Sequence, residues 1–489
     1  MRKSIAKNYI YNLTYQILSI LLPVITTPYL SRVLGAENIG IYGYTISIVT
    51  YFILFGTLGI SMYGQREIAY KARDKKEQSR TFFEIISLRA ITLTISIITF
   101  YIIFGRSGDY KIYYRILIIQ LVANLFDISW FFQGIEEFDK TVIRNSVIKL
   151  LSLVLIFVLV KKPEDLWLYF LIYVGAELIG NLTLWLYIPK YLEKISIKDL
   201  NFKKHLKPTI SLFIPQIAIQ IYTVLDKTMI GAIMNNMEEV GYYEQAQKII
   251  RATLTVVTAL QTVMNSRIAT SYINNDKDEV KLCLEKSFNF IWILSIPMMF
   301  GFIAISPKFV PWFYGDGFEA VTPILIATAP ILVVLGLNGV TGIEYLVQTG
   351  KQKIFTISVT IGAIVNVILN LILIHFFGGI GAAIASVLAE LSVLSVQLKY
   401  FKSQFSISQI MKMGSKCIIS GIVMYIVVYT VAKYLDISIF NTMLEIIIGG
   451  VTYVLLLIVL KYRFFLDLMN QLVNSVKNKL KRGDINEKN

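Results

Sequence analysis

Residues 354–376 read IFTISVTIGAIVNVILNLILIHF, and this stretch contains no Asp, Glu, Lys or Arg. A helix of about 17–25 predominantly apolar residues crosses the hydrocarbon core of a bilayer, so this stretch is long enough to span a membrane. Similar blocks recur along the 489 residues of the chain, of which 55% are hydrophobic and only 16% charged. Soluble domains carry about 25% charged residues. The composition therefore predicts an all-α polytopic membrane protein.

Clusters of Gly, Pro and charged residues divide the apolar sequence into fourteen predicted transmembrane helices. The predicted spans are 9–34, 40–65, 81–105, 112–133, 141–160, 166–189, 207–234, 241–270, 287–306, 321–348, 354–376, 380–398, 416–434 and 442–461. Beyond them, residues 463–489 combine apolar residues at helical spacing with several lysines. That pattern is typical of an amphipathic helix on the inner leaflet, and a partly disordered basic tail is the alternative.

The positive charge of the chain gives the orientation of the spans. With the N-terminus in the cytoplasm, 33 of the 47 Lys and Arg lie in cytoplasmic segments or the adjoining ends of spans, and 8 lie in outward segments or the adjoining ends of spans. The other 6 lie deeper within spans. Cytoplasmic loops carry such an excess, so we expect both termini in the cytoplasm. The net charge of +15 then reflects topology and contact with the lipid bilayer, and it does not indicate a nucleic-acid partner.

Motifs for cofactors or nucleotides are not apparent in the sequence. Cys283 and Cys417 lie far apart without a CxxC motif, and Gly350-Lys351 is not followed by the Ser or Thr of a phosphate-binding loop. We therefore expect neither a cofactor nor an enzyme, and the sequence favours a secondary transporter.

Three pairs of short motifs indicate an internal repeat. Ser19-Ile-Leu-Leu-Pro23 resembles Ser211-Leu-Phe-Ile-Pro215, Glu37-Asn-Ile-Gly40-Ile-Tyr42 resembles Glu238-Glu-Val-Gly241-Tyr-Tyr243, and Ala176-Glu-Leu178 resembles Ala389-Glu-Leu391. Each pair falls at the same position of a six-helix unit. Parallel repeats of this kind place the substrate between two halves that rock against each other.

Basic residues lie on the polar faces of several predicted helices. The clearest polar stripe follows helical spacing through Glu244, Lys248, Arg251, Thr255 and further polar residues to Asn265. Ionisable groups inside a membrane are costly and usually face a cavity or a partner, and polar contacts between packed helices are the alternative. We expect a cationic chamber that binds phosphate, with these candidate substrate-binding residues: Arg66, Arg89, Lys149, Lys227, Lys248 and Arg251.

The first seventy residues contain motifs of a known family. Pro28-Tyr-Leu-Ser-Arg-Val-Leu-Gly35, Gly40-Ile-Tyr42 and Gln65-Arg-Glu-Ile-Ala69 resemble the opening of Wzx-type polysaccharide flippases. Tyr222-Thr-Val-Leu-Asp226 and Gly381-Ala-Ala-Ile-Ala-Ser386 extend the resemblance into the second half. The resemblance implies membership of the multidrug/oligosaccharidyl-lipid/polysaccharide exporter superfamily, whose members have two pseudo-symmetric six-helix lobes arranged in a V.

For this chain the resemblance implies lobes at 1–200 and 201–402, two additional helices at 403–462 and the basic tail at 463–489. It also implies transport of undecaprenyl-diphosphate-linked oligosaccharide repeat units across the bacterial cytoplasmic membrane, with a polymerase and glycosyltransferases as pathway partners. The related lipid II flippases use a sodium site, whose comparable positions here are Asp226, Asn366, Asn370 and Glu390. They are candidates for coupling to Na⁺ or H⁺.

Three other interpretations remain. A lipid II flippase would differ in substrate rather than in mechanism. A multidrug antiporter of the same superfamily would need an acidic cavity for cationic drugs, whereas Arg89, Lys149 and Arg251 put bases on the polar faces. A membrane scaffold that transports nothing would have no use for the long polar stripes.

Overall fold

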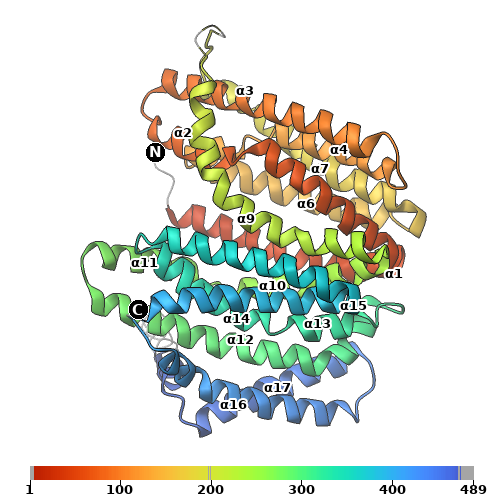
Figure 1. The fold of residues 1–489 in the computed structure, drawn as a ribbon, viewed down its shortest axis with the longest axis vertical. Helices are drawn as coiled ribbons and strands as arrows, with labels where there is room; N and C mark the ends of the chain where they lie inside the picture. The colour runs from red at the N-terminus through yellow and green to blue at the C-terminus, as the bar shows by residue number, and fades with distance from the viewer. Residues whose placement is uncertain (1–4, 197, 199, 403, 472–473, 475–489) are drawn as a thin grey trace, which may run out of the picture. The chain divides into compact units, whose positions relative to one another are not determined.

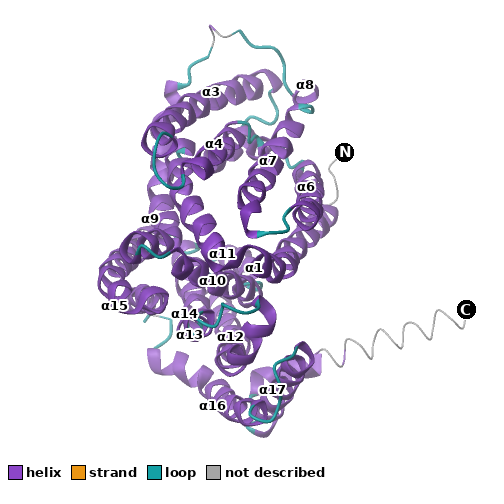
Figure 2. Ribbon diagram, turned by 90° about the vertical axis from the view of Figure 1, so that its right-hand side faces the viewer, coloured by secondary structure: helices purple, strands orange, loops and turns teal. Residues whose placement is uncertain are grey.

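The computed structural model describes residues 5–196, 198, 200–402, 404–471 and 474, which are called the described residues below. They form helices and loops and contain no β-strand (Figure 1 and Figure 2). The prediction of an all-α protein is therefore confirmed.

The helices follow one another along the chain with short connections. In order they are α1 Ile5–Thr57, α2 Ile60–Tyr70, α3 Lys75–Phe100, the π-helix η1 Tyr101–Gly105, α4 Lys111–Leu125, α5 Ser129–Gly134, α6 Phe138–Leu159, the 3₁₀-helix η2 Pro163–Asp165, α7 Leu166–Trp185, α8 Ile188–Tyr191, α9 Lys203–Met234, α10 Met237–Val257, α11 Gln261–Ile273, α12 Lys277–Tyr314, α13 Val321–Thr328, α14 Ile331–Asn338, the π-helix η4 Gly339–Val347, α15 Gln352–Phe401, α16 Ile407–Ala432 and α17 Ile439–Val459.

Among the described residues, ten helices are long and apolar enough to cross a membrane. Of these ten, Gln352–Phe401 contains the predicted spans 354–376 and 380–398, and Leu22–Tyr70 contains 40–65 and the second half of 9–34. The multi-pass character of the protein is confirmed, whereas the count of fourteen spans stays a prediction.

Glycine kinks explain why the two longest helices each cover a pair of predicted spans. Gly35 has φ 78° and ψ 169° inside α1, and Gly378 has φ 53° and ψ −130° inside α15. Such angles are readily available to glycine because it has no Cβ. The two kinks fall in the predicted turns at 35–39 and 377–379.

Several predicted spans are interrupted in the structure, and the breaks in 241–270 and 321–348 have clear local causes. The predicted helix 241–270 is divided into α10 and α11 by a turn at 258–260, in which the Gln261 amide donates to the Thr258 carbonyl at 3.0 Å. Threonine is a weak helix former because its branched side chain crowds the preceding turn, and Thr253, Thr255 and Thr258 precede or occupy this break. The predicted helix 321–348 is divided into α13, α14 and η4, beginning at Pro330, which has no amide hydrogen to donate.

The described chain packs into two compact units. The first unit takes its residues from Met1–Gln245, Tyr314–Gly317 and Leu369–Ala382, and the second from Ala246–Phe313, Phe318–Ile368 and Ala383–Asn489. The lobe boundaries at 200/201 and 402/403 were drawn from the sequence and stay predictions.

In the first unit, α4 packs lengthwise against α7 and also contacts α3, while α1 contacts α3, α6 and α9 (Figure 1). An aromatic cluster fills the core between α2, α3 and α5. The rings of Phe82 and Trp130 stack with their centroids 5.5 Å apart, and Phe131 meets Phe82 edge-on at 5.2 Å. Because Gly64 has no side chain, Trp130 packs directly on α2.

In the second unit, α16 and α17 form an antiparallel pair, which confirms the two predicted C-terminal helices (Figure 2). Trp292 of α12 packs on Gly414 of α16, and the Trp312 indole donates to the Thr442 hydroxyl at 2.7 Å. Residues 463–471 continue as helix, and the rest of the predicted amphipathic tail lies, apart from residue 474, outside the described residues.

Candidate substrate and ion sites

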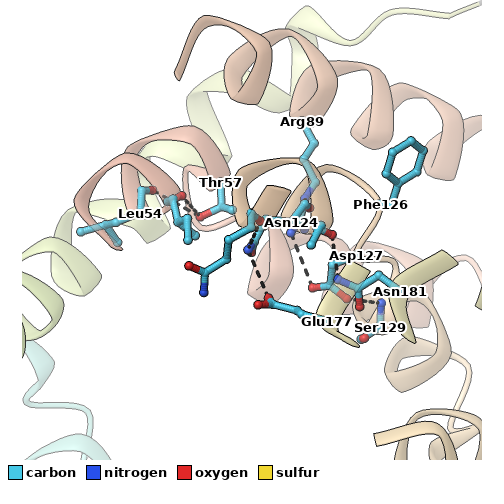
Figure 3. Close-up of polar contacts among 12 residues, drawn as sticks. Leu54, Thr57, Arg89, Asn124, Phe126, Asp127, Ser129, Glu177 and Asn181 are labelled. Carbon is cyan, nitrogen blue, oxygen red and sulfur yellow. Dashed lines mark hydrogen bonds and ion pairs between the residues drawn. The ribbon is translucent and has the colours of Figure 1, made fainter. Parts of the chain in front are cut away.

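The Arg89 side chain is buried in the first unit, with 1% of its surface exposed. Its Nε donates to the Asn124 carbonyl oxygen at 2.8 Å, and Nη2 lies 3.5 Å from the Asp127 carboxylate, where α4 ends (Figure 3). The remaining Nη1 has no hydrogen-bonding partner within the described residues. Arg89 therefore joins α3 to the end of α4 through an ion pair with one donor unused.

A second arginine beside this cluster was not identified from the sequence. Arg144 of α6 donates to the Asn181 side-chain oxygen at 2.5 Å and to the Ser129 hydroxyl at 3.0 Å, and Asn181 donates to the Ala123 carbonyl at 2.7 Å. Gly180 leaves room for Arg144 to cross α7. The signal was available, because Arg144 and Asn181 are polar residues inside the predicted spans 141–160 and 166–189.

The other candidate substrate-binding residues differ in exposure. Lys227 of α9 is buried and lies 2.9 Å from the Glu244 carboxylate of α10. Arg66 of α2 is exposed and contacts Glu67 at 3.3 Å. Three more candidates are half-buried or exposed: Lys149 on α6 in the first unit, and Lys248 and Arg251 on α10 in the second.

Asp226 and Asn370, two of the four candidate coupling residues, are in contact. The Asn370 amide donates to Asp226 Oδ1 at 2.7 Å, and the Tyr243 hydroxyl donates to Asp226 Oδ2. All three residues belong to the first unit and are at least nine-tenths buried. Carboxylate and amide oxygens are the ligands that hard cations prefer, so this cluster has the right donor chemistry for Na⁺.

The other two candidate coupling residues lie in the second unit. The Asn366 amide is 3.3 Å from the Ser386 hydroxyl, and the Asn338 amide donates to Glu390 at 2.5 Å. No group of three or more His, Cys, Asp or Glu side chains that would hold a metal ion occurs in the described part of the chain. Any ion bound here would therefore rely on amide, hydroxyl and carbonyl oxygens together with single carboxylates.

Two glycines of the internal repeat bring α1 and α10 into backbone contact within the first unit. A Cβ on Gly40 would overlap the Met237 carbonyl, and a Cβ on Gly241 would overlap the Ala36 carbonyl. The added Cβ on Gly40 would also lie 3.0 Å from the Gly241 amide nitrogen, and the added Cβ on Gly241 would lie 3.2 Å from the Gly40 amide nitrogen. The contact is reciprocal, because residues 36 and 40 of one repeat meet residues 237 and 241 of the other, as a two-fold relation requires.

Hydrogen bonds surround this glycine crossing. The Gln245 amide donates to the Ser31 hydroxyl at 2.8 Å, and the Ser47 hydroxyl lies 2.7 Å from that of Thr228. Glu239 accepts the Gly379 amide at 2.9 Å, which ties the turn of α15 to the start of α10. These contacts join the part of α1 around its Gly35 kink to α9 and α10, and the start of α10 to α15. Residues 35–39 and 235–240 are the predicted outward turns, so we expect this region on the outward side.

The buried carboxylate of Glu84 on α3 binds the first turn of α9 and the residue Asn201 just before it. It lies 2.7 Å from Lys204 Nζ and 2.9 Å from His205 Nε2, and it accepts the Asn201 amide at 2.9 Å. The Tyr63 hydroxyl, 2.7 Å from His205 Nδ1, extends this network to α2. The end of the predicted cytoplasmic segment 190–206 is therefore anchored to α2 and α3.

Two family models match the chain. One is described as polysaccharide biosynthesis protein and matches residues 5–265, and the other is lipid II flippase MurJ and matches residues 141–449. Fold and family together define a polytopic exporter of the multidrug/oligosaccharidyl-lipid/polysaccharide superfamily. Within it, the chain belongs to the polysaccharide biosynthesis protein family, and the resemblance to Wzx-type flippases is confirmed.

Relatives and solved structures agree with this assignment. A protein assigned as an O-antigen transporter of Escherichia coli (strain K12) is 24% identical over 82% of this chain and 97% of its own length. The inward closed structure of a lipid II flippase MurJ has a TM-score of 0.76 at 20% identity and covers 95% of this chain and 100% of that one. An inward-facing multidrug resistance MATE transporter has a TM-score of 0.61 at 15% identity, and the match covers 81% of this chain and 96% of that one. The chain is thus a transporter of the flippase type and not an enzyme.

Proposed function

We propose that the protein translocates undecaprenyl-diphosphate-linked oligosaccharide repeat units from the inner to the outer leaflet of a bacterial cytoplasmic membrane. The observation that carries this proposal is the similarity, over nearly the full length of the relative, to a protein assigned as an O-antigen transporter. The product would be capsule, O-antigen or another surface polysaccharide. Glycosyltransferases would supply the lipid-linked unit on the cytoplasmic side, a polymerase would join units outside, and both termini would be cytoplasmic.

We propose that the diphosphate is bound by cations of the predicted chamber. Arg251, Lys248 and Lys149 are the candidates within spans whose side chains are at least partly exposed, so they would make the first contacts, together with Arg66 at the cytoplasmic end. A guanidinium gives two parallel donors to a phosphate, which a lysine does not. Arg89 and Lys227 are buried in ion pairs, and they would bind substrate only by exchanging partners.

We propose that the glycine crossing closes the outward side while the substrate loads from the cytoplasm. Alternating access requires a contact that forms in one state and opens in the other. Backbone contact without intervening side chains suits that task, because it breaks without repacking a core. The cluster of Asp226 and Asn370 in the first unit would couple opening to Na⁺ or H⁺. Asn366 and Glu390 are the candidates for the same role within the second unit.

The proposal is tested by deleting the gene in its host and following the lipid-linked intermediate. Loss of transport should accumulate undecaprenyl-diphosphate-linked oligosaccharide on the inner leaflet and abolish the surface polymer, and the wild-type gene should restore both. Normal polymer in the deletion strain would contradict the proposal.

A lipid II flippase is the second candidate, because the MurJ family model matches residues 141–449 and a MurJ structure has the TM-score of 0.76. It predicts that this gene restores growth to a bacterium depleted of its own lipid II flippase. The multidrug antiporter would instead extrude cationic dyes from vesicles, and failure in both assays would leave the oligosaccharide flippase.

A further inference from the structure

A cavity of about 230 Å³ lies in the second unit, away from the residues discussed above. It is formed where α11 turns into α12, where η4 ends, and beside the segment that follows α15. Its polar lining includes Tyr272, Asn275, Lys277, Thr349, Lys351 and Gln404. All three segments lie in or beside predicted cytoplasmic loops, so we expect the cavity to face the inner-leaflet headgroups and the cytosol.

Both lysines of this cavity lack an acidic partner. Neither Lys277 nor Lys351 forms an ion pair with a carboxylate within the described residues, although Asp276 also lines the cavity. The Asp276 side chain accepts the Glu279 amide at 3.0 Å and so caps α12. The cavity therefore has two lysines and one carboxylate that is already hydrogen-bonded to the backbone.

Lys351 is held in position by a buried tyrosine. Its Nζ donates to the Tyr345 hydroxyl at 2.9 Å and lies 4.7 Å from the ring centroid. Gln404 approaches the same hydroxyl at 3.5 Å, and only 3% of Tyr345 is exposed. A fixed ammonium loses less conformational entropy on binding than a free one, which favours ligand binding.

We propose that this cavity binds a phosphate group of headgroup size. Two ammonium groups and the neighbouring hydroxyl and amide donors of Tyr272, Thr349, Asn275 and Gln404 supply the contacts that phosphate oxygens accept. The volume is smaller than the ~300–1,000 Å³ of sites for drug-sized molecules, so it suits a phosphoryl group with a short polar substituent. The ligand is either the headgroup of an anionic phospholipid or a soluble phosphate.

The test uses the full-length protein purified in a neutral detergent. Native mass spectrometry measures the binding of phosphatidylglycerol against phosphatidylcholine, and titration calorimetry measures glycerol phosphate and inorganic phosphate. The variant Lys277→Gln with Lys351→Gln removes both charges. Lys353→Gln is the matched control, because Lys353 is exposed two residues further on and does not line the cavity.

We expect phosphate binding to weaken about tenfold or more in the double variant, as the loss of charge-assisted hydrogen bonds predicts, and to be unchanged in Lys353→Gln. Tyr345→Phe should weaken it less, because it keeps both charges and frees Lys351. Binding of phosphatidylglycerol alone identifies a lipid headgroup, and binding of the soluble phosphates as well identifies a soluble ligand. Equal binding by the double variant and the control, or no binding of any of these probes, would overturn the proposal.

Discussion

Replacing Gly241 by alanine adds one carbon atom at the crossing of α1 and α10. That carbon would overlap the Ala36 carbonyl oxygen, which is backbone and cannot rotate away. The helices must separate, so the substitution destabilises only the state in which they touch. Gly40→Ala meets the Met237 carbonyl in the same way, and the two variants should therefore have the same effect.

The magnitude follows from the cost of overpacking. An extra methyl group in a well-packed contact costs about 1–3 kcal/mol, and each 1.4 kcal/mol changes an equilibrium constant about tenfold. The equilibrium constant between the state with this contact closed and the state with it open should therefore fall by a factor of about 5–150. The free-energy cost of closing the contact in the double variant should be less than the sum of the costs in the two single variants, because either substitution alone already separates the helices.

Cysteine accessibility measures this shift. Ile39 is buried beside Gly40, and Ile39→Cys in a background without Cys283 and Cys417 places one thiol at the crossing. An impermeant maleimide added outside should label it slowly in the parent and several-fold faster with Gly241→Ala. Gly43→Ala is the matched control, because its added carbon would meet Glu244 at an ordinary 3.6 Å.

Labelling that is equally slow in Gly241→Ala and Gly43→Ala, with both proteins folded, would contradict this prediction. It would mean that α1 and α10 are not in backbone contact in the membrane. Faster labelling with unimpaired polymer export would also contradict the proposal that this contact is part of the transport cycle.

Three further predictions follow from the clusters. Arg89→Ala should lower the amount of protein in the membrane, because it removes a charge-assisted hydrogen bond to the end of α4, at a cost of about 1.5–3 kcal/mol. Arg251→Ala should leave abundance unchanged and reduce export, because its side chain is exposed. Quantitative immunoblotting beside polymer assays separates the two, and equal loss of abundance would contradict this. Glu84→Gln should lower the melting temperature and speed proteolytic cleavage within residues 192–202, because charge-assisted bonds of about 1.5–3 kcal/mol each are lost. The control Glu77→Gln, which removes an exposed ion pair, should change neither the melting temperature nor the rate of cleavage. Asp226→Asn should reduce the dependence of transport on the Na⁺ or H⁺ gradient more than Ser47→Ala does, and transport that responds equally to the gradient in both would leave Asp226 a structural role.

The sequence was sufficient to predict the class of fold. Long uncharged segments such as 354–376 require helices that cross a membrane, and the turns at Gly35 and Gly378 fall where spans were predicted to end. The breaks at Thr258 and Pro330 were missed, because a hydropathy pattern averages over whole spans. Local hydrogen bonding and the missing proline amide determine where a helix stops.

The candidate site was harder to predict, because residue type does not give the partner. Arg89 and Arg251 look alike in the sequence, since each lies on a polar helical face. The structure buries Arg89 against Asp127 and leaves Arg251 exposed. The Glu84 anchor depends on a contact between residues more than a hundred positions apart, which helical periodicity cannot reveal. The Gly40 and Gly241 motifs were visible as a repeat, but their mutual contact required the fold.

The most direct test of the account is translocation by the purified protein in proteoliposomes. Undecaprenyl-diphosphate-linked oligosaccharide with a labelled sugar is incorporated, and a glycosidase outside the vesicles reports the glycans that reach the outer leaflet. We expect wild-type protein to make the inner-leaflet glycans accessible to the glycosidase and to move lipid II poorly. Arg251→Ala should slow the exposure of the glycans by about ten- to a hundredfold, because one charge-assisted contact is lost. Glycans that stay protected in the presence of folded wild-type protein would contradict the central claim, as would transport of lipid II alone.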